Sequence, residues 1–237
     1  MFHRLIKQLK QNKSFTPACR QAGSFRSFTL IELLIVIAIL ALLMSIIIIT
    51  LNPSEILKQT RDTKRISNLK SINNALSIFQ ATKPTTSMGT ASIVYISIPD
   101  TTSTCANLGL PTLPAGYTYA CATTANYKKT DGTGWIPVNF DSLDIGSPLS
   151  SLPIDPTNTT STNLFYTYTT GGSWELNALL ESSKQKLSGG DDKTSIDGGD
   201  SYSTYEIGTD LSLSPYKDTG LVGYWKMDEG SGTTTAD

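Results

Sequence analysis

A long run of apolar residues is the clearest pattern in this chain of 237 residues. From Leu33 to Leu51 no residue is charged, and only Ser45 and Thr50 are polar. A helix of this length reaches across the ~30 Å hydrocarbon core of a bilayer while making every backbone hydrogen bond internally. The run therefore predicts a membrane-spanning helix near the N-terminus.

A helical pattern of a different kind follows, between residues 52 and 83. Asn52, Pro53 and Glu55 predict a helix start, with Asn as the N-cap and Glu reaching back to it. Apolar residues then recur every three or four positions and form one stripe: Ile66, Leu69, Ile72, Leu76 and Phe79. We expect the charged residues of this segment to form mainly a solvated or subunit-facing surface. They are Lys58, Arg61, Asp62, Lys64, Arg65 and Lys70.

Beyond residue 84 the pattern changes to short β-prone runs separated by Pro and Gly. The alternation of aromatic residues with threonine in the run LFYTYT suits a half-buried antiparallel strand. The predicted strands are 91–98, 117–122, 135–138 and 164–169, and 174–180 is either another strand or a short helix. The predicted fold class is therefore α+β, with a long N-terminal transmembrane helix packed on a small antiparallel sheet.

One carboxylate, Glu32, lies directly before the apolar run. A charge at the edge of a membrane segment costs a few kcal/mol and by default indicates a function. The simpler interpretation places Glu32 in the lipid interface, where the dipole at a helix N-terminus favours an anion.

The residues around Glu32 support a sharper interpretation. Phe28-Thr29-Leu30-Ile31-Glu32 resembles the cleavage and methylation motif of type IV pilins and type II secretion pseudopilins. The resemblance implies that a prepilin peptidase cuts between Ser27 and Phe28 and that the new amine of Phe28 is methylated. It also implies that Glu32 pairs with the N-terminus of a neighbouring subunit during assembly. The chain departs from the motif at Ser27, where the family usually has Gly.

The leader, residues 1–27, agrees with this resemblance. It carries six positive charges and no acidic residue: Arg4, Lys7, Lys10, Lys13, Arg20 and Arg26. Such an excess holds the leader on the cytoplasmic side of the membrane. The motif precedes the apolar run, whereas an ordinary secretory signal is cut after it. The helix would therefore remain in the mature protein.

The resemblance implies partners and a location. The partners are the prepilin peptidase and methyltransferase, other pilin or pseudopilin subunits, the inner-membrane assembly machinery and the membrane. The location is the bacterial cytoplasmic membrane, crossed once with the head outside, and then an extracellular filament. Weaker resemblances to pilin-like proteins are 134–140, 152–156 and 205–208, each of which could be fold scaffolding.

Composition argues against catalysis and nucleic-acid binding. Without the six charges of the leader, 13 of the 19 basic residues remain against 20 acidic ones, a net charge of −7 with no basic stripe. The one histidine, His3, lies in the leader, so the mature chain has no imidazole for a general base. We expect no enzyme activity and no cofactor.

Cys105 and Cys121 are an even pair in the part expected outside the cytoplasm. A disulfide that closes a loop of about 16 residues would stabilise the fold by about 3 kcal/mol. The alternative is two buried thiols.

Four aspartates crowd the Gly-rich stretch SGGDDKTSIDGGD: Asp191, Asp192, Asp197 and Asp200. Oxygen ligands on a flexible loop suit calcium, and several pseudopilins hold calcium in a C-terminal loop. The spacing does not match an EF-hand, however, and a solvated loop is the simpler interpretation. The four residues are weak calcium candidates.

The last segment, GLVGYWKMDEGSGT at 220–233, resembles the opening strand of laminin-G-type, concanavalin-like jelly rolls. A jelly roll needs two sheets, so we expect the chain to be the start of a longer protein. The predicted parts are the leader 1–27, the transmembrane helix 28–51, the amphipathic helix 52–83, the head 84–215 and the jelly-roll start 216–237. The predicted function is a structural, minor subunit of a type IV pilus or type II secretion pseudopilus. The alternative is a membrane-anchored adhesin or carbohydrate-binding protein.

Overall fold

The computed structural model describes residues 28–216, which belong to two compact units with their boundary between Thr50 and Leu51. The first unit contains one helix, α1 (Leu30–Leu51), which is long and apolar enough to cross a membrane. From Leu30 to Ile47 all of its side chains are exposed. The leader, Ser27 and the jelly-roll resemblance at 220–233 lie outside the described residues.

The second unit begins with a local break at Asn52 and the helix α2 (Pro53–Thr82). Asn52 has a left-handed φ of 41°, a conformation that asparagine tolerates better than most residues. The predicted capping box is wrong, because this backbone differs from the extended one of a usual N-cap and Asn52 makes no side-chain cap hydrogen bond. Glu55 instead accepts hydrogen bonds from Ser183, far along the chain.

Five strands form one sheet in the order β2-β1-β3-β4-β5. They are β1 (Ile93–Ile96), β2 (Thr118–Cys121), β3 (Tyr166–Thr170), β4 (Trp174–Leu179) and β5 (Thr204–Gly208). The α+β, pilin-like fold class is confirmed. The sheet is mixed instead of purely antiparallel, because the long connection between β1 and β2 returns the chain in the same direction.

The strand predictions were right except at two places. The run 135–138 is no strand, although Trp135 and Ile136 are buried in the core. This run buries its apolar side chains without forming the backbone hydrogen bonds of a sheet strand. An isolated antiparallel bridge joins Asp131 and Asn139 on its two sides. The second difference is β5, which was noted only as a weak resemblance at 205–208.

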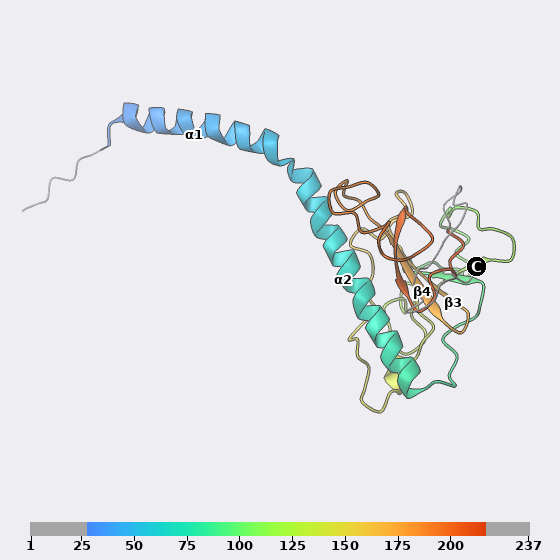
Figure 1. Cartoon of the computed structure of the whole chain (residues 1–237). Coiled ribbons are helices and arrows are strands. Elements are labelled where there is room, and N and C mark those ends of the chain that lie inside the picture. Colours follow the sequence, from blue (N-terminus) through green and yellow to red (C-terminus); the bar gives the residue numbers. More distant parts are fainter. Residues whose placement is uncertain (1–27, 217–237) are drawn as a thin grey trace, which may run out of the picture. The chain divides into compact units, whose positions relative to one another are not determined.

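The apolar stripe of α2 packs against one face of the sheet (Figure 1). Four of its five predicted residues are fully buried, and Ile66 is half-buried. They contact the aromatic and aliphatic residues of β3 and β4: Tyr166, Tyr168, Trp174, Leu176 and Ala178. Trp174, the first residue of β4, also donates its indole N–H to Asn73 Oδ1 of α2 at 2.8 Å. The helix and the sheet therefore share one core.

Candidate processing and assembly site

The start of α1 is organised by a hydrogen-bonded pair, Thr29 and Glu32. The backbone N–H and the hydroxyl of Thr29 donate to Glu32 Oε2 at 2.9 and 2.8 Å. The Glu32 backbone N–H donates in turn to Thr29 Oγ1 at 3.3 Å. This reciprocal arrangement is a capping box, in which two otherwise unpaired helix N-terminal amides find acceptors.

The capping box explains how the helix can begin at Leu30. Thr29 lies directly before the first helical residue, and Glu32 is the third residue of the helix. The signal was present in the sequence as Thr-x-x-Glu, but the interpretation of Glu32 considered only the lipid interface and subunit pairing. Within the described chain, the carboxylate is exposed and satisfied by its own helix start.

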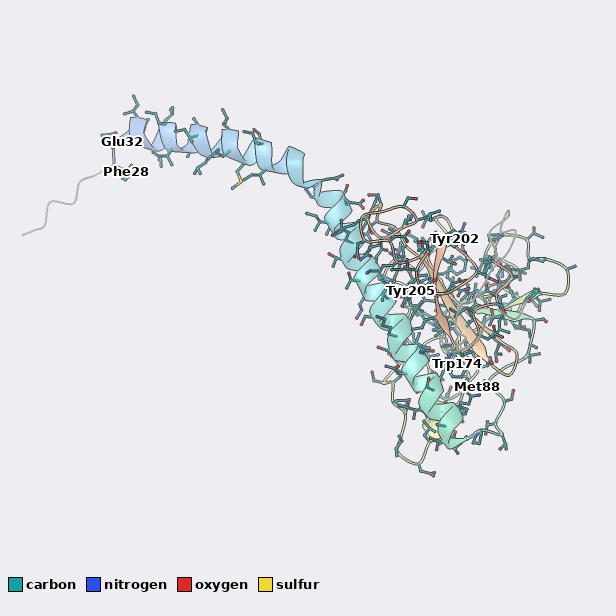
Figure 2. The ribbon with its side chains drawn as sticks, viewed as in Figure 1. Phe28, Glu32, Met88, Trp174, Tyr202 and Tyr205 are labelled. Carbon is teal, nitrogen blue, oxygen red and sulfur yellow. A yellow bond between two sulfur atoms is a disulfide. The ribbon has the colours of Figure 1, made fainter. Side chains whose placement is uncertain are left out.

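The site joins a negative group to a wholly apolar surface. Phe28 and Glu32 lie at the same end of α1 (Figure 2), and the exposed side chains that follow are aliphatic up to Ile47, apart from Ser45. The Ser45 hydroxyl donates to the Leu42 carbonyl at 2.7 Å, so this polar group is satisfied within the helix. Such a helix can be buried by lipid or by other helices of the same kind.

Comparison with known proteins fits this geometry. Residues 24–48 match the family model of the prokaryotic N-terminal methylation motif. The chain carries a prepilin-type methylation motif. Together with the apolar helix, the match supports membership of the type IV pilin and pseudopilin family. No curated protein and no solved structure matches the chain significantly.

The pilin-like head contains the expected disulfide. Cys105 and Cys121 are bonded, with their Cα atoms 5.4 Å apart. Cys121 ends β2, and Cys105 lies in the connection that leads from β1 to β2. The bond thus closes the connection that gives the sheet its parallel pair. Cys105 belongs to the same buried apolar cluster as Val94 and Ile96 of β1, the strand that pairs with β2.

The four weak calcium candidates are largely engaged by their own loop. Asp191 pairs with Lys193 at 2.7 Å, and both oxygens of Asp192 accept hydrogen bonds from residues 188–195, which lower the pKa of its carboxyl. Asp197 accepts the backbone N–H of Glu206 at 2.7 Å, and burial raises the pKa of Asp197 to about 6. Asp200 is buried. Among the described residues, no three acidic, His or Cys groups are placed to hold a metal ion, and calcium binding stays a prediction.

A buried ion-pair network on α2 corrects the expectation of a solvated charged surface. The side chains of Asp62 and Arg65 are fully buried. The Arg65 guanidinium donates to both oxygens of Asp155, at 2.6 and 2.9 Å, and to Asp62 at 2.8 Å. A further bond of 2.7 Å reaches Glu181, which follows β4. Helical periodicity could not reveal this, because the partners lie about 90 and 120 residues further along the chain.

The network has clear electrostatic consequences. Burial of Glu181 is outweighed by hydrogen bonds from Arg61 and Arg65, which lower the pKa of the Glu181 carboxyl to about 2. The network also includes backbone groups, because the Asp62 carboxylate accepts hydrogen bonds from the backbone N–H groups of Glu181 and Ser182 at 2.8 and 2.7 Å. The network thus fixes α2 against the 152–156 segment and the end of β4.

A second buried cluster, also missed from sequence, contains two glutamates. Glu175 of β4 and Glu206 of β5 lie on the sheet face opposite α2, and each is 1% exposed. Ser214 N–H donates to Glu175 at 2.7 Å, and Ser201 N–H donates to Glu206 at 3.0 Å. The other oxygen of each carboxyl group, Oε1, is buried without a hydrogen-bond partner within the described residues. Burial raises the pKa of both carboxyl groups, and their mutual repulsion raises that of Glu206 further.

Proposed function

We propose that this protein is a structural, minor subunit of a type IV pilus or of a type II secretion pseudopilus. The observation that carries the proposal is the methylation motif at 24–48, joined to a helix whose apolar surface is exposed from Leu30 to Ile47. A helix of this kind is stored in the membrane and then packed against identical helices in a filament core.

The proposed processing follows from the position of the motif. A prepilin peptidase removes residues 1–27 by cutting between Ser27 and Phe28, and the exposed amine of Phe28 is then methylated. Ser27 replaces the usual Gly, but it is also small and uncharged. The six positive charges of the leader keep the cutting site on the cytoplasmic side, where they oppose translocation.

The proposed assembly step uses Glu32. In the described chain, both hydrogen bonds from Thr29 go to one oxygen, Oε2. The methylated amine of a neighbouring Phe28 would approach the other oxygen and form a charge-assisted hydrogen bond. Pairing removes two opposite charges from an apolar helix bundle, where either alone would be costly. Pairing therefore favours one register between neighbouring helices.

Mass spectrometry of the mature protein from membranes tests this proposal. We expect a chain that begins at Phe28 and carries one methyl group on its amine. The matched controls are Ser27→Gly, which should be cut at least as well, and Ser27→Lys, which should leave the leader attached. A wild-type protein that retains Met1 in a strain with active peptidase would contradict the proposal and favour a membrane-anchored adhesin.

A further inference from the structure

The first turn of α2 and the loop after β4 are neighbours, and we call their exposed aliphatic residues the aliphatic pole. It consists of Ile56, Leu57 and Leu187, with Lys58, Lys184 and Lys186 beside them. Glu55 ties its two parts together, because one oxygen of its carboxylate accepts the N–H and the hydroxyl of Ser183 at 2.5 and 2.8 Å. The loop therefore has a fixed place beside the start of the helix.

The loop itself is compact. The backbone N–H of Lys186 donates to the Ser182 carbonyl at 3.3 Å, and that of Gly189 donates to the Lys186 carbonyl at 2.9 Å. The Asp191 N–H then returns to the Lys184 carbonyl at 2.9 Å. These bonds hold Leu187 at a tight turn next to the segment that Glu55 anchors.

The aliphatic side chains of the pole are exposed. Ile56 is 46% exposed, Leu57 is 59% exposed and Leu187 is 53% exposed. Further along α2 the apolar residues Leu69, Ile72, Leu76 and Phe79 are fully buried, and Ile78, at 39% exposure, is less exposed than the residues of the first turn. A cluster of exposed aliphatic residues at a defined place marks an interaction surface.

The charges around the pole leave a small positive excess. Lys58, Lys184, Lys186 and Lys193 are its basic residues, against Glu55, Asp191 and Asp192. Two of these lysines are ion-paired, Lys58 with Glu55 at 3.8 Å and Lys193 with Asp191 at 2.7 Å, and Asp192 is hydrogen-bonded within its loop, so the positive excess lies at Lys184 and Lys186. Aliphatic side chains flanked by lysines whose ammonium groups can reach phosphates are typical of surfaces that lie on a bilayer.

The short connection between α1 and α2 indicates which surface the aliphatic pole would contact. Ile56 follows Leu51, the last residue of α1, by five residues, which is about 8 Å of helical chain. If α1 spans the membrane, as the proposed function requires, the pole starts within a few residues of the lipid headgroups.

We infer that the aliphatic pole docks on the phospholipid surface of the membrane that holds α1, with Ile56, Leu57 and Leu187 in the interface and the lysines at the phosphates. The inference rests on the proposed function only for the anchor. Docking would hold the head on the membrane before assembly, and extraction into a filament would have to release it.

Tryptophan quenching by brominated lipids tests the docking directly. The full chain is placed in vesicles of brominated phosphatidylcholine and phosphatidylglycerol as the Leu187→Trp variant. The native Trp135 and Trp174 are 1% exposed in the core, and Trp225 is common to all variants. We expect quenching of the introduced Trp at least about two-fold above that of a control placed away from the interface.

Ile145 supplies the matched control. It is an aliphatic residue with 78% exposure, and it lies close in sequence to Phe140, which contacts Phe79 near the other end of α2. Ile145→Trp should therefore not be quenched above background. Adding Leu57→Ser to Leu187→Trp, or adding Lys184→Glu with Lys186→Glu, should reduce the quenching.

Flotation of the same vesicles separates failure of the anchor from failure of the docking. Protein that does not float with the vesicles contradicts the membrane anchor and the docking together. Protein that floats while Leu187→Trp and Ile145→Trp are quenched equally contradicts only the docking. Floating protein in which Leu187→Trp is quenched, and in which Leu57→Ser weakens the effect, supports it.

Discussion

Arg65 is the residue on which most of the buried charge of the head depends. Its guanidinium bonds three carboxylates, those of Asp62, Asp155 and Glu181. Asp155 also accepts the backbone N–H of Thr157 at 2.8 Å, so the network orders the chain around it. A buried charge that loses its partner is far more costly than a surface charge that does.

We expect Arg65→Ala to lower the free energy of unfolding by roughly 3–5 kcal/mol, because the buried carboxylates of Asp62 and Asp155 lose the cation that pairs with them. The matched control is Arg61→Ala, since Arg61 pairs with Glu181 but is 37% exposed, and it should cost about 1 kcal/mol or less. Urea unfolding, followed by circular dichroism, measures both. Equal, small effects would mean that Arg65 is solvated and the network absent.

The glutamate pair predicts an unusual dependence of stability on pH. The pKa of Glu175 and that of Glu206 are raised in the folded protein, so the fold binds a proton that the unfolded chain releases above its ordinary glutamate pKa. The free energy of unfolding contributed by the pair is therefore fully present below about pH 4.5 and is lost as the pH rises through neutrality. The lowered pKa of Glu181 has the opposite effect: its contribution to the free energy of unfolding is present above about pH 4.5 and is lost as the pH falls toward 2.

Melting temperatures between pH 5 and pH 9 test this dependence. Wild type should become steadily less stable over that range, while Glu206→Gln, which keeps the shape and cannot ionise, should flatten the curve. Glu55→Gln is the control, because the hydrogen bonds from Ser183 lower the pKa of the Glu55 carboxyl and its titration therefore lies below this pH range, so the slope should be unchanged. A flat wild-type curve without added cations would mean that the pKa of the two carboxyl groups is not raised. A slope removed by calcium would mean that a cation neutralises it instead.

Glu32 caps its own helix, and the proposed function gives it a second role in pairing between subunits. We expect Glu32→Ala to reduce incorporation into filaments at least about ten-fold, because an unpaired Phe28 amine would remain in an apolar bundle. Membrane insertion should be unaffected. Thr29→Val is the control for the capping box alone and should leave most of the incorporation intact. Filament yield, measured by shearing and immunoblotting, would contradict the pairing role if Glu32→Ala matched wild type.

At the scale of elements, sequence patterns succeeded where one local rule decides the structure. The stripe on α2 was predictable because one helix face packs on one sheet face, and period-3.6 spacing reports that directly. The strands β1, β2 and β3 were predictable from β-branched and aromatic runs between turns. The run 135–138 has the same composition but contributes to the core without pairing, which propensity cannot distinguish.

The elements that sequence missed depend on distant partners. By local pattern Arg65 and Asp62 are predicted to be solvated helix residues, but in the fold Arg65 is ion-paired with Asp155 and Glu181. Glu55 fits a capping box locally, yet its hydrogen bonds go to Ser183. The strand β5 buries Glu206, a residue that a strand prediction normally treats as a solvent-facing position. Tertiary contacts overrode the local preference in each case.

The disulfide stabilises the connection between β1 and β2, the parallel pair of the sheet. We expect Cys105→Ser combined with Cys121→Ser to lower the free energy of unfolding by about 3 kcal/mol, since the loop of 16 residues is no longer closed in the unfolded chain. Chemical denaturation with and without a reducing agent measures the loss, and the agent should have no effect on the double variant. Leader cleavage should be unchanged, because the motif at 24–48 belongs to the other compact unit.

At the scale of the whole molecule, the chain separates an anchor from a self-contained head. The buried core, the ion-pair network, the glutamate pair and the disulfide all lie between residues 62 and 216. The described side chains of α1 up to Ile47 are exposed and contribute nothing to that core. Membrane attachment and head stability should therefore be independent properties.

A fragment that starts at Asn52 tests this independence. We expect it to fold with the same disulfide and to unfold at a urea concentration within experimental error of the full chain in detergent, since none of the side chains described before Asp62, at 28–47 and 52–61, is buried in the core. It should not float with vesicles, because the aliphatic pole alone gives only weak, reversible binding without the anchor. The control is a fragment starting at Lys70, which lacks Asp62, Arg65 and Leu69 and should fail to fold. Loss of cooperative unfolding in the fragment from Asn52 would show that α1 is part of the folding unit of the head.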